Sequence, residues 1–344
     1  MKRVVLAMAI LLLGSALIGV ETRNRFSLLA GAEDGVQGLG AVWTLDLQHQ
    51  ESLGVYSAQA GYSMHAYALN TWEAKRSLQM DAETYRWWLS LQNPQSELRI
   101  GLQQINFGVA QVLRPLKWFD TLQAQDPYQL SRGVDALLFR HYWLNNANLW
   151  LWGLPGSGDL KGIEFLPGKE DSAEYGGRIQ YPLAIGEGAI SAHYRKLEVG
   201  EEYRVGFDLR YDGTIGAWLE TAGSHFSKSG IFLPAYTASA TLGLDYVWAY
   251  GNGLALTLEN MINVSAEASL GTAKRQNLST AALFSYPLGL LDSVSLLAYA
   301  DWDGGDWALN AAWRRMYDYI SLDLNLGSSS LKDFQAQAMI SVNL

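Results

Sequence analysis

The sequence contains no cysteine, and charged residues make up only 17% of its 344 positions, whereas an average soluble domain has about 25%. The absence of cysteine excludes disulfides, thiol-dependent catalysis and cysteine-ligated metal sites. It also argues against a lipoprotein anchor, which requires a cysteine at the mature N-terminus. The low charge favours a chain that exposes much of its apolar surface to lipid.

Long apolar runs are scarce as well. After the first 20 positions no stretch approaches the roughly 18 apolar residues that a transmembrane helix requires. Basic residues are in the minority, with 25 Lys and Arg against 34 Asp and Glu, so nucleic acid is not an expected partner. The five histidines are scattered without ligand spacing, and we predict neither a metal nor a cofactor.

The N-terminus predicts a secretory signal over residues 1–19. Lys2 and Arg3 provide a positive start, Val4–Leu13 an apolar core, and small residues follow near a cleavage point. The core is too short to span a bilayer as a helix. Residues 20–344 are then expected to form one domain, with a net charge of −11 because two of the 25 basic residues are lost.

From Arg25 to Leu344, segments of roughly ten residues alternate apolar and polar side chains, and turn residues separate them. Every second connection is short, and the long ones fall between. This pattern predicts an all-β fold, a transmembrane antiparallel β-barrel of about 18 strands, with 16 as the other even count. The strands are expected at 25–33, 37–48, 54–72, 82–92, 97–106, 133–143, 147–153, 173–181, 188–198, 201–211, 213–221, 236–248, 253–263, 275–286, 293–302, 306–316, 318–326 and 333–344.

A barrel of this kind places the protein in the outer membrane of a Gram-negative bacterium, with both termini on the periplasmic side. The expected partners are the lipid bilayer, including lipopolysaccharide or other outer-leaflet lipids, and small hydrophilic solutes. The 13 Trp and 18 Tyr suit the aromatic girdles of such barrels. Since many porins are trimers, a homotrimer stays open.

Alternation along the strands assigns six arginines to the inner wall, and on strand 82–92 it places Tyr85 outward and Arg86 inward. Strand 133–143 is apolar on both faces, and Arg140 is placed inward because a lipid-facing arginine near the midplane costs about 2–4 kcal/mol. Two readings stay open for them: a track that lines the pore for anions, or ion pairs with carboxylates such as Glu97, Asp135 and Asp208 that brace the lumen. The facing wall is sparser and acidic, with Asp245, Glu259 and Asp323. The predicted pore-lining residues are Arg86, Arg99, Arg140, Arg178, Arg195, Arg204 and Arg210.

The longest interruption, residues 107–132, predicts a constriction loop. Leu116, Trp118 and Phe119 are too apolar for a loop in water and should pack on the barrel interior. Arg114, Lys117 and Asp120 would then stand at the narrowing. A cap on the outer surface is the alternative. The glycine-rich segment Gly153–Gly158 predicts a flexible extracellular loop.

Several segments resemble a porin-like outer-membrane barrel family of Gram-negative bacteria, over roughly Tyr85–Leu154. They are Arg99–Gly108, Leu113–Asp120, Asp126-Pro127, Gly133-Val134 and Asn145–Gly153. More distantly, the layout is similar to alginate-export and phosphate-selective porins, whose pores are arginine-lined. The resemblance implies a porin fold and passive transport, without a particular solute.

The sequence thus predicts a non-enzymatic outer-membrane porin for small hydrophilic, especially anionic, solutes. The alternative is a non-conducting barrel that serves as a surface receptor, adhesin or interaction platform. A hydrolase is disfavoured, because Ser191 and His193 lie two positions apart on one strand, nearly 7 Å, which is too far for a nucleophile and its base.

Overall fold

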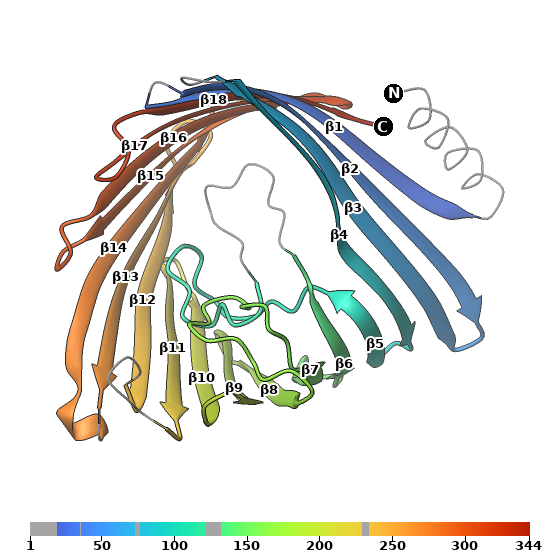
Figure 1. Cartoon of the computed structure of the whole chain (residues 1–344), viewed down its shortest axis with the longest axis vertical. Coiled ribbons are helices and arrows are strands. Elements are labelled where there is room, and N and C mark those ends of the chain that lie inside the picture. Colours follow the sequence, from blue (N-terminus) through green and yellow to red (C-terminus); the bar gives the residue numbers. More distant parts are fainter. Residues whose placement is uncertain (1–18, 35, 73–75, 121–131, 229–233, 268) are drawn as a thin grey trace.

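A computed structural model of the chain describes residues 19–34, 36–72, 76–120, 132–228, 234–267 and 269–344. The described residues form one antiparallel sheet of 18 strands. The sheet closes on itself because β1 pairs with both β2 and β18 (Figure 1). The strands are β1 (Val20–Glu33), β2 (Val36–Leu53), β3 (Tyr56–Trp72), β4 (Arg76–Gln92), β5 (Ser96–Gln103), β6 (Val134–Tyr142), β7 (Asn148–Pro155), β8 (Ala173–Leu183), β9 (Gly186–Lys196), β10 (Glu201–Asp212), β11 (Gly216–Phe226), β12 (Tyr236–Trp248), β13 (Leu254–Ala266), β14 (Lys274–Pro287), β15 (Asp292–Asp301), β16 (Trp307–Met316), β17 (Ile320–Ser329) and β18 (Gln335–Asn343).

The predicted all-β barrel of 18 strands is confirmed, strand for strand. One short 3-10 helix, Leu270–Thr272, precedes β14. Among the described residues, no helix is long and apolar enough to cross a membrane. The signal expected at residues 1–19 lies almost wholly outside the described residues and stays a prediction.

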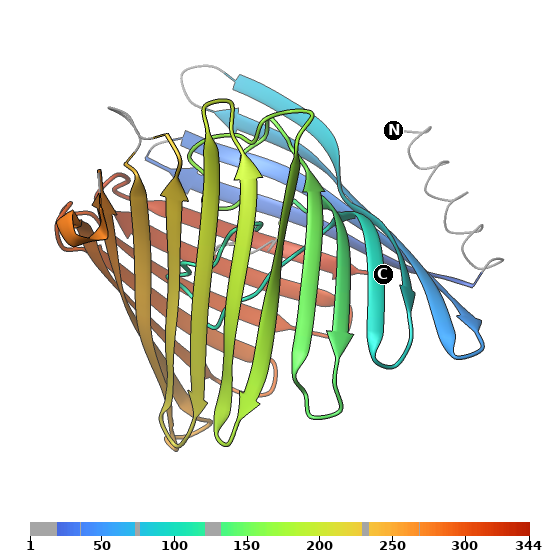
Figure 2. The ribbon, with the colours of Figure 1, turned by 90° about the horizontal axis from the view of Figure 1, so that it is seen from below.

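The two ends of the barrel differ in their connections. Turns that follow even-numbered strands are short, such as the one between β8 and β9, and they gather at one end (Figure 2). The long connections, after β5, β7 and β11, start at the other end. We call this the long-loop end.

Side chains alternate between the two faces of the wall, as a pleated strand requires. On β10, Tyr203, Val205 and Phe207 are exposed on the outside, while Arg204 and Asp208 are buried on the inside. A wall that is apolar outward and polar inward belongs in a lipid bilayer, since the closed ladder leaves no unpaired sheet edge.

On β4 a facing prediction is wrong. Tyr85 was expected to face outward, but it is buried and its hydroxyl donates to Asp46 at 3.0 Å. The cause is a β-bulge: Ser63 pairs with Arg86 and the next residue, Met64, pairs with Thr84, which leaves Tyr85 as an extra residue. A bulge shifts the alternation by one position, so Tyr85 and Arg86 both face inward.

Candidate functional site

The chain that leaves β5 folds into the barrel instead of outward, as the sequence predicted (Figure 1). Its apolar side chains pack against the inner faces of β6 and β7, where Trp118 is only 1% exposed. This contact explains why β6 is apolar on both faces. The cluster comprises Ile105, Phe107, Leu116, Trp118, Phe119, Val134, Ala136, Leu138, Trp152 and Leu154. We call residues 104–120 the inner loop; residues 121–131 of the predicted loop lie outside the described part of the chain.

Glu220, on the inner face of β11, binds the backbone of the inner loop. Its Oε2 accepts hydrogen bonds from the amides of Val109 at 2.7 Å and Ala110 at 2.8 Å, and its Oε1 accepts from Leu116 at 2.8 Å. The side chain is fully buried. Hydrogen bonds to a charged acceptor stabilise by about 1.5–3 kcal/mol each, so Glu220 is a strong anchor.

Glu259, on β13, binds the next stretch of the same backbone. Its carboxylate accepts from Gln111 at 2.7 Å, Val112 at 3.0 Å and Leu113 at 2.6 Å. Trp218 Nε1 also donates to it, at 3.1 Å. Two buried carboxylates thus replace the strand partners that the loop backbone lacks.

Gly108 permits this close approach. Its φ is +100°, a region that side chains with a Cβ atom rarely adopt. A Cβ atom at this position would lie 2.5 Å from Oε2 of Glu220. Only glycine therefore lets the inner loop turn directly over the carboxylate.

A second loop, residues 156–172 after β7, also enters the barrel, whereas the sequence predicted a flexible extracellular loop over Gly153–Gly158; the first three of those residues belong to β7. The amide of Ile163 donates to the carbonyl of Lys117 at 3.1 Å, so the two loops touch. Gly162 has φ +49°, and a Cβ atom there would lie 2.2 Å from that carbonyl. The second loop therefore covers the inner loop from the long-loop end.

Glu164 of this second loop reaches the inner wall. It lies 3.0 Å from Arg195 and 3.4 Å from Arg204, and Lys161 of its own loop is 3.8 Å away. Burial raises the pKa of the Glu164 carboxyl above its ordinary value, although Arg204, Arg195 and Lys161 act in the opposite direction. The second loop is therefore held to the wall by a buried ionic cluster.

Three of the predicted pore-lining arginines face inward but are covered. Arg178 pairs with Asp208, and both Arg195 and Arg204 pair with Glu202. The three side chains are between 1% and 4% exposed. Their charges are compensated by carboxylates in buried ion pairs. These arginines therefore brace the wall and hold the second loop.

Three others, Arg86, Arg99 and Arg140, line a polar cavity of about 390 Å³ on the inner wall of β2–β6, which we call the arginine cavity. Glu97 pairs with both Arg99, at 2.5 Å, and Arg140, at 3.1 Å. Arg86 donates to Gln104 of the inner loop at 2.7 Å. The only carboxylate among the described lining residues is Asp46.

Each of these three guanidinium groups lies over an aromatic ring. The Cζ atoms of Arg99 and Arg140 are 4.1 Å and 4.3 Å from the ring centroids of Trp88 and Trp150. Arg86 lies 5.4 Å from the ring of Tyr85. Stacking on a ring fixes the orientation of each planar guanidinium group. The N–H bonds lie in the guanidinium plane and therefore remain available to form hydrogen bonds.

The seventh arginine, Arg210, lies apart from both groups. It is one-third exposed near the short-turn end and pairs with Asp212 at 2.6 Å. Asp135, a predicted inner partner, is on the exposed face of β6 and forms no ion pair within the described residues. The sequence thus placed seven arginines on the inner wall without separating the braced from the accessible ones.

The predicted constriction residues occur together on the inner loop. Arg114 forms a bidentate pair with buried Asp120, at 3.0 and 3.1 Å, and also donates to Asn106. Lys117 is half-buried, and burial lowers the pKa of its ammonium group. Trp118 and Phe119 are in the apolar cluster and pack the loop against the inner faces of β6 and β7.

Ser191 and His193, which lie two positions apart on β9, have separate partners on the inner wall. Ser191 accepts a hydrogen bond from Arg178 at 3.2 Å, while His193 accepts one from Trp152 at 3.1 Å. No group of three or more potential ligands for a metal exists in the described part of the chain.

The closed barrel, the apolar outer wall and the inward loops define a porin-like transmembrane β-barrel. No family model matches the chain, and no curated protein matches it. The similar solved structures include Pseudomonas aeruginosa OccK5 (OpdH), with a TM-score of 0.63 and 12% identity over 94% of this chain and 97% of that one.

Two others are Pseudomonas aeruginosa OccK2 (OpdF) in complex with glucuronate and OpdK with vanillate. OccK2 has a TM-score of 0.63 and 11% identity over 94% of this chain and 96% of that one. OpdK has a TM-score of 0.62 and 12% identity over 94% of this chain and 98% of that one. At these identities the similarity shows the fold. It supports the porin-like resemblance but not the particular similarity to alginate-export or phosphate-selective porins.

Proposed function

We propose that this protein is an outer-membrane diffusion channel for small hydrophilic solutes, with a preference for anions. The observation that carries the proposal is the arginine cavity, in which Arg86, Arg99 and Arg140 face a single lining carboxylate, Asp46. Selectivity of a pore follows the charges that line it more than the total charge of the protein.

The arginine cavity has unused capacity for an anion. Glu97 neutralises one of the two guanidinium charges that it bridges, because a single carboxylate serves both Arg99 and Arg140. The Nε atoms of Arg86 and Arg140 are buried and have no hydrogen-bond partner within the described residues, so an anion would bind through the terminal N–H groups instead. Guanidinium groups bind carboxylates and phosphates through paired N–H donors, so either class of anion fits this chemistry.

The similar structures favour the carboxylates. OccK2 is in complex with glucuronate and OpdK is with vanillate, and both molecules carry a carboxylate. The stacked aromatic rings beside the three arginines would suit the apolar face of a sugar acid or an aromatic acid. We therefore infer that small organic carboxylates are the preferred solutes.

The inner loop would narrow the path to this cavity. Gln104 and Asn106 of the inner loop are among the cavity-lining residues, so the loop forms one side of the passage. Arg114, Lys117 and Asp120 stand further along the same loop. Fixing the loop with Glu220 and Glu259 would keep the width of the passage constant.

The test is ion selectivity in planar bilayers. The double variant Arg86→Gln and Arg99→Gln should lower the anion-to-cation permeability ratio several-fold and weaken current block by glucuronate or vanillate. Arg275→Gln removes an exposed arginine, paired with Asp303, and is the matched control. An unchanged ratio in the double variant would reject the anion preference. No current from the folded wild-type barrel would reject the channel and favour a receptor, adhesin or interaction platform.

A further inference from the structure

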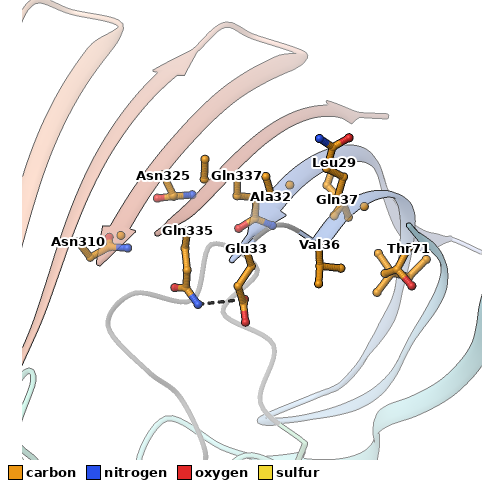
Figure 3. Close-up of a pocket in the computed structure, with 15 residues that line it drawn as sticks. Leu29, Ala32, Glu33, Val36, Gln37, Thr71, Asn310, Asn325, Gln335 and Gln337 are labelled. Atoms are coloured by element: carbon orange, nitrogen blue, oxygen red, sulfur yellow. Dashed lines mark hydrogen bonds between the residues drawn. The ribbon is translucent and has the colours of Figure 1, made fainter. Parts of the chain in front are cut away.

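A separate cavity of about 530 Å³ opens at the long-loop end of the barrel (Figure 3). Its lining residues come from β16–β18 and β1–β3, which are neighbours in the ring. This volume lies within the usual range of small-molecule sites, roughly 300–1,000 Å³. No arginine, lysine or histidine is among its described lining residues. Its chemistry therefore differs from that of the arginine cavity.

Carboxamide side chains dominate the polar lining. The strand register sets Gln337 directly opposite Asn325, and Gln335 opposite Gly327, which in turn faces Asn310. These pairings put the four amides on one inner face of three neighbouring strands, as Figure 3 shows. We call the site the amide cavity.

Three of the four amides are unused by the protein. Within the described residues, Asn310, Asn325 and Gln337 form no hydrogen bond, while Gln335 donates to Glu33 at 3.0 Å. A carboxamide both donates and accepts hydrogen bonds. A hydroxyl group does the same, so a row of free amides matches a row of hydroxyls.

The charge in the amide cavity disfavours ions. Glu33 is the one carboxylate among the lining residues, and it is paired with Lys332 at 2.6 Å as well as with Gln335. An anion would meet a carboxylate with no free cation beside it. A cation would find that carboxylate already neutralised.

Beside the amides, the β1–β2 part of the same inner wall carries small residues. Gly31 and Gly38 are paired in register, and Gly31 is also paired with Gln337. A Cβ atom at Gly38 would make only ordinary contacts, the closest at 3.6 Å, so a side chain fits there without displacing its neighbours. Leu29 and Leu69 add an apolar surface beside it, which suits the C–H faces of a sugar.

We propose that the amide cavity binds a neutral polyhydroxylated solute of monosaccharide size at the mouth of the barrel. Gly38 and Asp46, which belong to the two cavities, are eight residues apart on β2, or about 27 Å. A small solute cannot occupy both sites at once. The amide cavity is therefore a second site, with a specificity that is independent of the anion preference.

The experiment uses glucose as the probe and the full-length barrel in a planar bilayer. Glucose should interrupt the salt current in a concentration-dependent manner. Asn325→Leu, which removes a free amide, and Gly38→Leu, which fills the space, should each weaken the apparent glucose affinity at least tenfold. Heat-resistant mobility on gels shows that each variant is folded.

Gln59→Leu is the matched control, because Gln59 is an amide on β3 that lines neither cavity and forms a hydrogen bond with Gln50. It should leave glucose binding unchanged. The proposal is overturned if glucose does not interrupt the wild-type current, if Asn325→Leu and Gly38→Leu bind as the wild type does, or if Gln59→Leu has the larger effect. The anion-to-cation permeability ratio is measured separately in each variant, so failure here is distinguishable from failure of the anion preference.

Discussion

The backbone amide of Leu113 donates a 2.6 Å hydrogen bond to the carboxylate of Glu259, which lies 146 residues later in the chain. With Glu220, this contact fixes the inner loop to the β11–β13 side of the barrel. The loop leaves the wall at β5, and five strands of the ring, β6–β10, lie between its origin and the nearer anchor on β11. The width of the passage thus depends on two side chains that the loop itself does not contain.

Removal of Glu259 should loosen the inner loop and increase single-channel conductance. Glu259→Ala leaves three loop amides without their charged acceptor, and each such bond stabilises by about 1.5–3 kcal/mol. We expect a several-fold higher mean conductance with more current noise. Asp323→Ala, which removes a wall carboxylate paired with Arg314 away from the loop, is the control. Equal conductance in Glu259→Ala and the wild type would mean that the loop does not narrow the pore.

Much of the barrel could be predicted because lipid imposes a strict period of two on each strand. Inward Arg204 and outward Phe207 follow directly from that alternation. The inward fold of the inner loop could also be predicted, because Leu116 and Trp118 need a dry surface. Tyr85 was placed wrongly because a bulge adds one residue, and no local signal marked it.

The partners of the loops could not be predicted from the sequence. Alternation places Glu220 on the inner wall, but it does not tell which loop crosses the barrel to meet it. Likewise, the sequence left open whether Arg195 and Arg204 line the pore or form ion pairs, because their partner Glu164 comes from a loop whose glycines suggested flexibility. One sequence signal for an ordered loop was present. Lys161 and Glu164 have opposite charges three residues apart, and they form an ion pair within that loop.

The orientation in the membrane predicts which ends are accessible from outside the cell. Because the chain lacks cysteine, single cysteines can be introduced without a background. Cysteines at Ser157 and Ser227, in long-loop connections, should react with a membrane-impermeant maleimide on intact cells. A cysteine at exposed Asn252, in the β12–β13 turn, should react only after lysis. The reverse labelling pattern would invert the proposed orientation.

Buried Arg178 should matter for stability far more than exposed Arg210. Arg178→Met leaves Asp208 buried without its cation, and breaking such a pair costs about 3–5 kcal/mol. Arg210→Met breaks a largely exposed pair, which contributes about 0–1 kcal/mol. Urea unfolding in lipid vesicles measures both. The double variant Arg178→Met, Asp208→Leu should recover most of the loss, and equal destabilisation of the two single variants would contradict the bracing role.

Lys117 should make the anion preference of the channel fall at alkaline pH. Burial lowers the pKa of its ammonium group from the ordinary 10.5, so this positive charge is lost earlier than on an exposed lysine. In the interval between the lowered pKa and 10.5, the docked loop binds fewer protons than a released loop would. A rise in pH there therefore strengthens docking while it removes a cation from the narrowing.

The measurement is the anion-to-cation permeability ratio as the pH is raised towards 10.5. The wild-type ratio should decline within this interval. Lys117→Arg keeps the charge throughout and should stay anion-preferring, because arginine is not deprotonated in this range. Lys117→Met should start from a lower ratio and change little. A wild-type decline that persists unchanged in Lys117→Met would assign the titration to another group and remove Lys117 from the constriction.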